Sequence, residues 1–205
     1  MNTGFFPVMQ VIKNNRSWLI ISLLIFALGF FSFMGNNLAS GQEQGEIINQ
    51  EMMVFLEQIV EFIEESHPLM GSLLIFLNNL VSSLQMLFLG VILGISPLLT
   101  LLVNGAVLGT VSVQVLGEGA SPWFLVAGIV PHGIPELAAF FICSALGLKI
   151  GYHTIISPLP DKSRKQSFKF IWKEIISVLP LVVVLLFIAA VIEIYITKNL
   201  LTSFL

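Results

Sequence analysis

The sequence predicts an all-α membrane protein of about five transmembrane helices, one of them broken at a Pro-His-Gly motif, plus an extracytoplasmic amphipathic acidic helix. Three observations support this fold class. Of the 205 residues, 56% are hydrophobic and only 10% are charged, whereas soluble domains carry roughly 25% charged residues. Long apolar runs cover most of the chain, and its acidic and basic residues are segregated. This composition gives no support to nucleic-acid binding.

The first transmembrane helix is expected at residues 17–35. Residues 18–34 contain no charge and follow Lys13 and Arg16, and this length is close to the ~20 residues that cross a bilayer. A cleaved signal peptide is the competing interpretation, but the apolar stretch exceeds the usual ~7–15 residues. Since no Ser/Gly linker or charged tract divides the apolar part of the chain, we assign one membrane domain to residues 1–205.

A second, acidic element is expected at residues 42–67. It contains several glutamates and no lysine or arginine, and its apolar residues recur at helical spacing: Ile48, Met52, Phe55, Ile59 and Phe62. This segment is too charged to cross a membrane and lacks the basic face of a membrane-surface helix. Its apolar stripe is expected to pack on the protein's own helices or on a second copy, or to dock an external partner. The expected partners are membrane lipids and a homo-oligomer, with a dimer favoured, or other membrane or extracytoplasmic proteins.

Turn residues divide the remaining apolar tract. Gly94 before Ser96-Pro97, and Gly119 before Ser121-Pro122, each predict that one helix ends and the next begins. The resulting elements are spans at residues 70–95 and 97–116, a longer element at 122–156, a basic cytoplasmic loop at 157–173 and a last span at 174–197.

The basic residues predict the orientation of the chain in the membrane. Eight of the nine lysines and arginines lie before the first span or between the fourth and fifth spans, and Lys149 is counted with the second group. Short loops rich in these residues stay in the cytoplasm. We therefore expect a multi-pass protein of the cell membrane with a cytoplasmic N-terminus and an extracytoplasmic C-terminus.

The element at residues 122–156 is too long to be one straight span. It would measure about 52 Å as a continuous helix, against a ~30 Å hydrocarbon core. The run Pro131-His132-Gly133-Ile134-Pro135 predicts a break inside the membrane, with a half-length helix before it and a second helix that starts at Pro135. Glu136 would then lie in the first turn of that second helix. An ionisable residue at membrane depth indicates a functional site, but His132 and Glu136 could equally stabilise a kink.

Further polar and small residues on neighbouring spans predict an interior seam. The candidate residues are Asn78, Asn79, Asn104, Gly105, Gly109, Pro131, His132, Gly133 and Glu136. Gly105 and Gly109 have the spacing that allows two helices to approach closely. Glu193, one turn from the end of the last span, is expected to extend toward the outer surface.

The sequence predicts no catalytic site, no metal site and no cofactor. His132 and Glu136 are four residues apart but have no evident third ligand for a zinc ion. We find no glycine-rich phosphate loop and no nucleophile elbow. Cys143 lies within an apolar run and is expected to be a small core residue.

Asn104-Gly105-x-x-x-Gly109, followed by Pro131-His132-Gly133-x-x-Glu136 and then Gly147, resembles the stage II sporulation protein M family. The resemblance implies a small polytopic membrane protein that, in spore-forming bacteria, anchors and organises peptidoglycan-degrading partners at the division septum. It favours a non-catalytic membrane scaffold that recruits partners.

The alternative is a transporter or channel for an ion or small solute that uses the broken helix and the polar seam. The two functions differ in one structural respect. The deciding observation is whether Asn79, Asn104, His132 and Glu136 converge around a water-accessible cavity, which favours a transporter, or around a dry, packed kink, which favours a scaffold.

Overall fold

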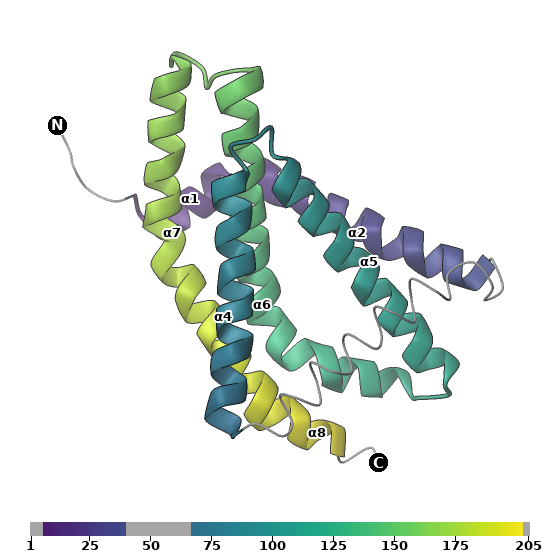
Figure 1. The fold of residues 1–205 in the computed structure, drawn as a ribbon. Helices are drawn as coiled ribbons and strands as arrows, with labels where there is room; N and C mark the ends of the chain where they lie inside the picture. Colours follow the sequence, from purple (N-terminus) through teal and green to yellow (C-terminus); the bar gives the residue numbers. More distant parts are fainter. Residues whose placement is uncertain (1–5, 40–66, 203–205) are drawn as a thin grey trace.

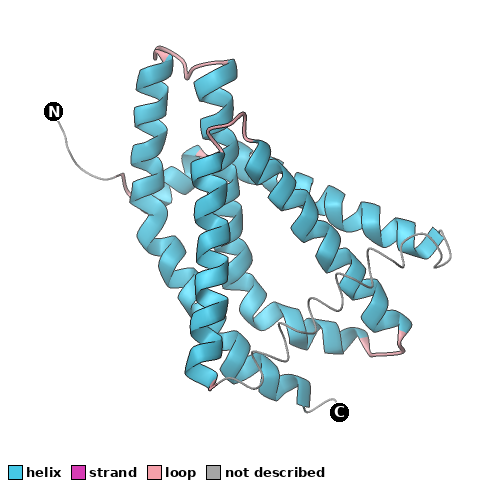
Figure 2. Ribbon diagram, in the orientation of Figure 1, coloured by secondary structure: helices cyan, strands magenta, loops and turns pink. Residues whose placement is uncertain are grey.

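The computed structural model describes residues 6–39 and 67–202, and the secondary structure in these ranges is entirely helical (Figure 2). The elements are α1 (Val8–Asn14), α2 (Arg16–Ala39), α4 (Pro68–Leu89), α5 (Ile95–Gly117), α6 (Pro122–Gly151), η1 (Tyr152–Ile156), α7 (Arg164–Ile192), η2 (Glu193–Thr197) and α8 (Lys198–Thr202). The acidic helix expected at residues 42–67 falls almost entirely outside the described residues.

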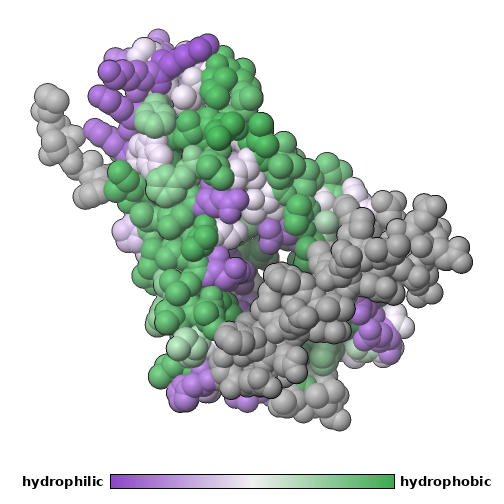
Figure 3. Space-filling model, viewed as in Figure 1, coloured by the Kyte–Doolittle hydropathy of each residue, from purple (hydrophilic) through white to green (hydrophobic). Residues whose placement is uncertain are grey.

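Within those ranges, four helices are long and apolar enough to cross a membrane. The bent pair α1 and α2, which meet at 66°, gives a fifth candidate span. The predicted all-α membrane fold is therefore confirmed. Large hydrophobic side chains such as Leu24, Phe31 and Phe187 are more than half exposed, as expected for surfaces that contact lipid. In Figure 3 hydrophilic residues gather at the end of the molecule where α6 and α7 are joined, and hydrophobic residues cover most of the flank below.

The helices form two groups (Figure 1). In one group α6 packs along α7, with α4 against both; in the other α2 packs along α5. Small residues allow the close approach within the second group: a Cβ on Gly109 would lie 2.5 Å from the carbonyl oxygen of Phe30, and one on Gly105 would clash with the Phe26 carbonyl. These contacts agree with the packing role expected for the Gly105 and Gly109 pair.

Apolar residues fill the interface between α6 and α7. Ala139, Cys143, Leu146 and Ile150 on α6, and Ile171, Ile175, Val178, Val182 and Leu186 on α7, are each at most 2% exposed. They recur at spacings of three and four, which places them along one face of each helix. The middle of this helix pair is therefore dry and closely packed.

Several expected boundaries differ from the structure. The second span, predicted to end at residue 95, ends as α4 at Leu89. The loop between the fourth and fifth spans is shorter than the predicted 157–173, because α7 begins at Arg164. Ser163 and Gln166 form a reciprocal capping box that starts the helix there. Arg164, Lys165, Lys169 and Lys173 therefore lie on the first turns of α7, and Lys149 is buried within α6 and does not lie in a loop. At another boundary, α5 starts at Ile95 with Gly94 as its N-cap, whereas the sequence predicted Ser96 as the N-cap and Pro97 as the first helical residue, two residues later.

Candidate functional site

Helix α6 carries two of the polar residues that the sequence analysis selected. The predicted break at the Pro-His-Gly motif is wrong: α6 stays helical from Pro122 to Gly151 with Pro131 and Pro135 inside it, and it curves without interruption (Figure 1). Neighbouring helices support a proline-containing helix inside a membrane, and this allows it to continue. Because the helix continues, His132 and Glu136, four residues apart, lie on one face.

The segment that follows α7 completes a cluster with these two side chains. His132 Nδ1 lies 3.2 Å from Thr197 Oγ1. One ligand atom from each of His132, Glu136 and Glu193 lies within 4.8 Å of the others. Glu193 and Thr197 are the two ends of η2, a single π-helical turn. Such turns are rare in proteins, and those that occur are often found at functional sites.

The position predicted for Glu193, with its side chain extending toward the outer surface, is therefore wrong. Glu193 lies instead against α6, beside Glu136. It is the acidic residue in the last apolar run, which is a signal for an intramembrane site. Its partners could not be identified from spacing, because they depend on how α6 and α7 align along their length.

In the part of the chain that the structure describes, the cluster contains two carboxylates and no lysine or arginine to balance their negative charge. Among the described residues, neither Glu136 nor Glu193 forms an ion pair with a lysine or arginine. Two ionised carboxylates within 4.8 Å of each other repel by roughly 3 kcal/mol at an effective dielectric constant of about 20. Both side chains are partly buried. The arrangement therefore favours a positive charge, either a proton or a metal cation, between the carboxylates.

A cavity of about 240 Å³ lies beside the cluster, between α6 and the α2–α5 pair. His132, Gly133 and Glu136 line it from α6, and Asn104 lines it from α5 together with Val107, Leu108 and Val111. Phe26 and Phe140 also line it and are only 9% exposed. Their rings meet edge to face at a centroid distance of 6.2 Å, so an aromatic contact closes this part of the cavity wall.

The other candidate residues have different surroundings. Asn78 and Asn79 on α4 do not line the cavity, so the expected convergence holds for Asn104, His132 and Glu136 but not for Asn79. The amide of Asn78 donates to the Asn79 oxygen at 3.5 Å. Gly105, Gly109 and Pro131 do not line it either. Gly133 does, and a Cβ added there would meet only Ile129, at 3.5 Å. Gly133 therefore leaves open space and does not serve close helix packing.

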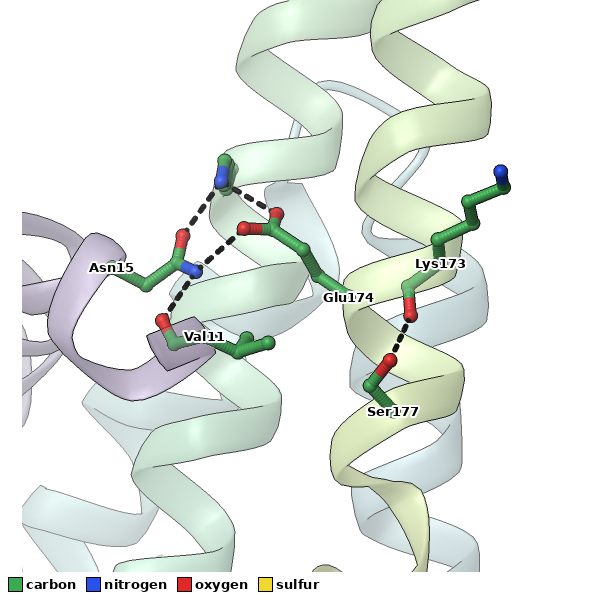
Figure 4. A network of polar contacts seen from close by, with 6 residues as sticks. Val11, Asn15, Lys173, Glu174 and Ser177 are labelled. Carbon is green, nitrogen blue, oxygen red and sulfur yellow. Dashed lines mark hydrogen bonds and ion pairs between the residues drawn. The ribbon is translucent and has the colours of Figure 1, made fainter. Parts of the chain in front are cut away.

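A second polar cluster lies at the other end of the α6–α7 pair and was not predicted (Figure 4). Lys149 Nζ donates to Glu174 Oε2 at 2.6 Å and to Asn15 Oδ1 at 2.7 Å. The Asn15 amide in turn donates to Glu174 Oε1 at 3.1 Å and to the Val11 carbonyl at 2.8 Å. Because Asn15 sits at the bend between α1 and α2, this cluster joins the N-terminal helices to α6 and α7. Each charge in it has a partner, unlike those near Glu193.

Comparison with known proteins adds the family of the chain. The sequence profile described as Stage II sporulation protein M matches residues 17–198. The chain belongs to this family. The chain is also 30% identical over 191 residues to a protein of Methanocaldococcus jannaschii named Uncharacterized protein MJ0793, covering 91% of this chain and 97% of that protein. No solved structure matches the chain. Membership of the stage II sporulation protein M family confirms the resemblance found in the Pro131 to Glu136 motif.

Proposed function

We propose that this protein is a non-catalytic membrane carrier for a small cation, with its binding site in the polar wall of the cavity between α6 and the α2–α5 pair. The observation that carries the proposal is the convergence of Asn104, His132 and Glu136 on a cavity of about 240 Å³. A dry kink would bury these groups against their neighbours. Here they face a cavity whose other lining residues are mainly apolar, and its volume is large enough for water molecules to contact these three polar groups.

Packed side chains close part of the surroundings of the cavity. The α6–α7 interface is packed with aliphatic side chains, and the edge-to-face contact of Phe26 and Phe140 adjoins the cavity. A cation bound near Glu136 would have to pass this closed region to cross the membrane. Carriers use such an arrangement, in which helix groups rearrange around a site in the membrane.

The exposed basic residues support the orientation proposed for this carrier. Lys13, Arg16, Lys165, Lys169 and Lys173 lie on or beside the ends of α1, α2 and α7 that are close to the Asn15–Lys149–Glu174 cluster. If these bases face the cytoplasm of the cell membrane, the cavity and Glu193 lie toward the extracytoplasmic side.

The test is flux in liposomes reconstituted with the purified full-length protein, assayed for protons and for common monovalent and divalent cations. Wild-type protein should carry at least one of them, and Glu136→Gln should abolish that flux because glutamine cannot bind or release charge. Glu118→Gln is the matched control, since Glu118 is an exposed residue at the end of α5. Absence of flux for every cation in protein that is folded would overturn the proposal.

A membrane scaffold that recruits partners is the second candidate. The role that the resemblance to the stage II sporulation protein M family implies, and the amphipathic stripe expected in the acidic segment, favour it. In a scaffold, His132→Gln and Glu136→Gln would leave assembly intact, because both replacements keep the size and hydrogen-bonding capacity of the side chain. Flux lost with assembly retained supports the carrier.

A further inference from the structure

We propose that His132, Glu136 and Glu193 form a binding site for a divalent first-row transition-metal cation such as Zn²⁺. This inference rests on the proposed carrier function and names the class of cation. It concerns a site that the sequence alone does not suggest, because the third ligand comes from a segment 57 residues further along the chain than Glu136.

The distances suit a metal. No pair of the three ligand atoms is more than 4.8 Å apart, and small side-chain rotations would bring them to the Zn–ligand distances of about 2.0–2.2 Å. The two carboxylates supply the negative charge that a divalent cation neutralises. Within the described part of the chain no lysine or arginine forms an ion pair with either one, so no basic side chain occupies the position of the cation.

The donor set distinguishes between classes of cation. Imidazole nitrogen together with carboxylate oxygen suits zinc, manganese, cobalt and iron, whereas calcium and magnesium prefer oxygen ligands alone. His132 and Glu136 also line the cavity, so a cation held by them would face it. Three protein ligands leave at least one coordination position for water, which allows the cation to exchange.

The turn η2 positions the third ligand and holds the histidine. It carries Glu193 at one end and Thr197 at the other, and the Thr197 hydroxyl lies 3.2 Å from His132 Nδ1 while being only 4% exposed. With Thr197 on Nδ1, the ring would be held in place and Nε2 would be the ligand atom. Metal-bound histidines have an outer partner of this kind. Thr197 is therefore a positioning residue.

The first measurement is metal binding by the purified full-length protein in detergent, without a polyhistidine tag. Titration with Zn²⁺ by calorimetry, and with Co²⁺ by its visible absorption, should show one site per chain. Zn²⁺ should also raise the melting temperature, and millimolar Mg²⁺ should not compete. If Zn²⁺ does not bind the wild-type protein, or Mg²⁺ displaces it, the metal assignment is overturned.

Variants identify the ligands. Glu193→Gln and His132→Gln should each weaken Zn²⁺ binding by about 100-fold or more, and Thr197→Val by roughly 10–100-fold, as for other outer-shell partners. Glu118→Gln should bind as wild type. Because each variant's melting temperature is measured with and without Zn²⁺, a folded variant that keeps the wild-type shift contradicts the assignment of that residue.

The outcomes separate this inference from the carrier proposal. Proton or monovalent-cation flux that depends on Glu136, without Zn²⁺ binding, would overturn the metal site and leave the carrier standing. Tight Zn²⁺ binding without any flux would support the metal site and overturn the carrier.

Discussion

Lys149 Nζ lies 2.6 Å from Glu174 Oε2, with both side chains almost completely buried between α6 and α7. Further along, α6 and the η2 turn that follows α7 bring Glu136 and Glu193 together. No basic side chain of the described residues forms an ion pair with either carboxylate. One end of the helix pair is thus neutralised by the protein itself. The other end has a charge requirement that an external cation can meet.

The buried ion pair leads to a stability prediction. Lys149→Met should destabilise the protein by about 3–5 kcal/mol, because it leaves the Glu174 carboxylate buried without a cation. Replacing both residues with apolar ones, Lys149→Met with Glu174→Leu, should recover most of the loss. Thermal unfolding in detergent measures the effect, with Lys173→Met as the control because Lys173 is exposed. Equal melting temperatures for Lys149→Met and this control would contradict a structural role for the pair.

Substitution by alanine should destabilise the protein at one glycine of α6, Gly147, and have little effect at another, Gly133. A Cβ on Gly147 would lie 2.5 Å from the Met86 carbonyl oxygen, so Gly147→Ala should force α4 and α6 apart and lower the melting temperature. Gly133 has open space around it, so Gly133→Ala should leave the melting temperature almost unchanged. Gly133→Leu should fill the cavity. Folding yield and melting temperature test both, and a strongly destabilised Gly133→Ala would show that the site is already close-packed.

The spans could be predicted because their signals are local. Apolar length and the Ser121-Pro122 cap are properties of consecutive residues, and the structure confirms a helix start at Pro122 with Ser121 as its cap. The break at Pro131 was wrong because a proline's effect depends on what the neighbouring helices provide. Glu193 and the Lys149–Glu174 pair were missed for a related reason, since both depend on the alignment of α6 with α7.

The acidic segment, which falls almost entirely outside the described residues, gives a prediction about assembly. Phe55→Asp should disrupt the homo-oligomer or the binding of an external partner, because it places a charge in the apolar stripe at a cost of roughly 2 kcal/mol or more. Glu57→Gln on the opposite face should have little effect. Light scattering of the purified protein and crosslinking in membranes measure the assembly, and equal effects of the two changes would remove the case for a buried stripe.

Labelling of single cysteines distinguishes a water-accessible cavity beside the polar groups of α5 and α6 from a dry kink. Val107 lines the cavity, whereas Val103 is 56% exposed on α5 but does not line it. The native Cys143, 1% exposed, should stay unlabelled in wild-type protein. A membrane-impermeant thiol reagent added outside intact cells should label Val107→Cys and leave Val103→Cys unmodified in lipid. Failure to label Val107→Cys from either side of the membrane, in protein that folds normally, would show that the cavity is closed to water.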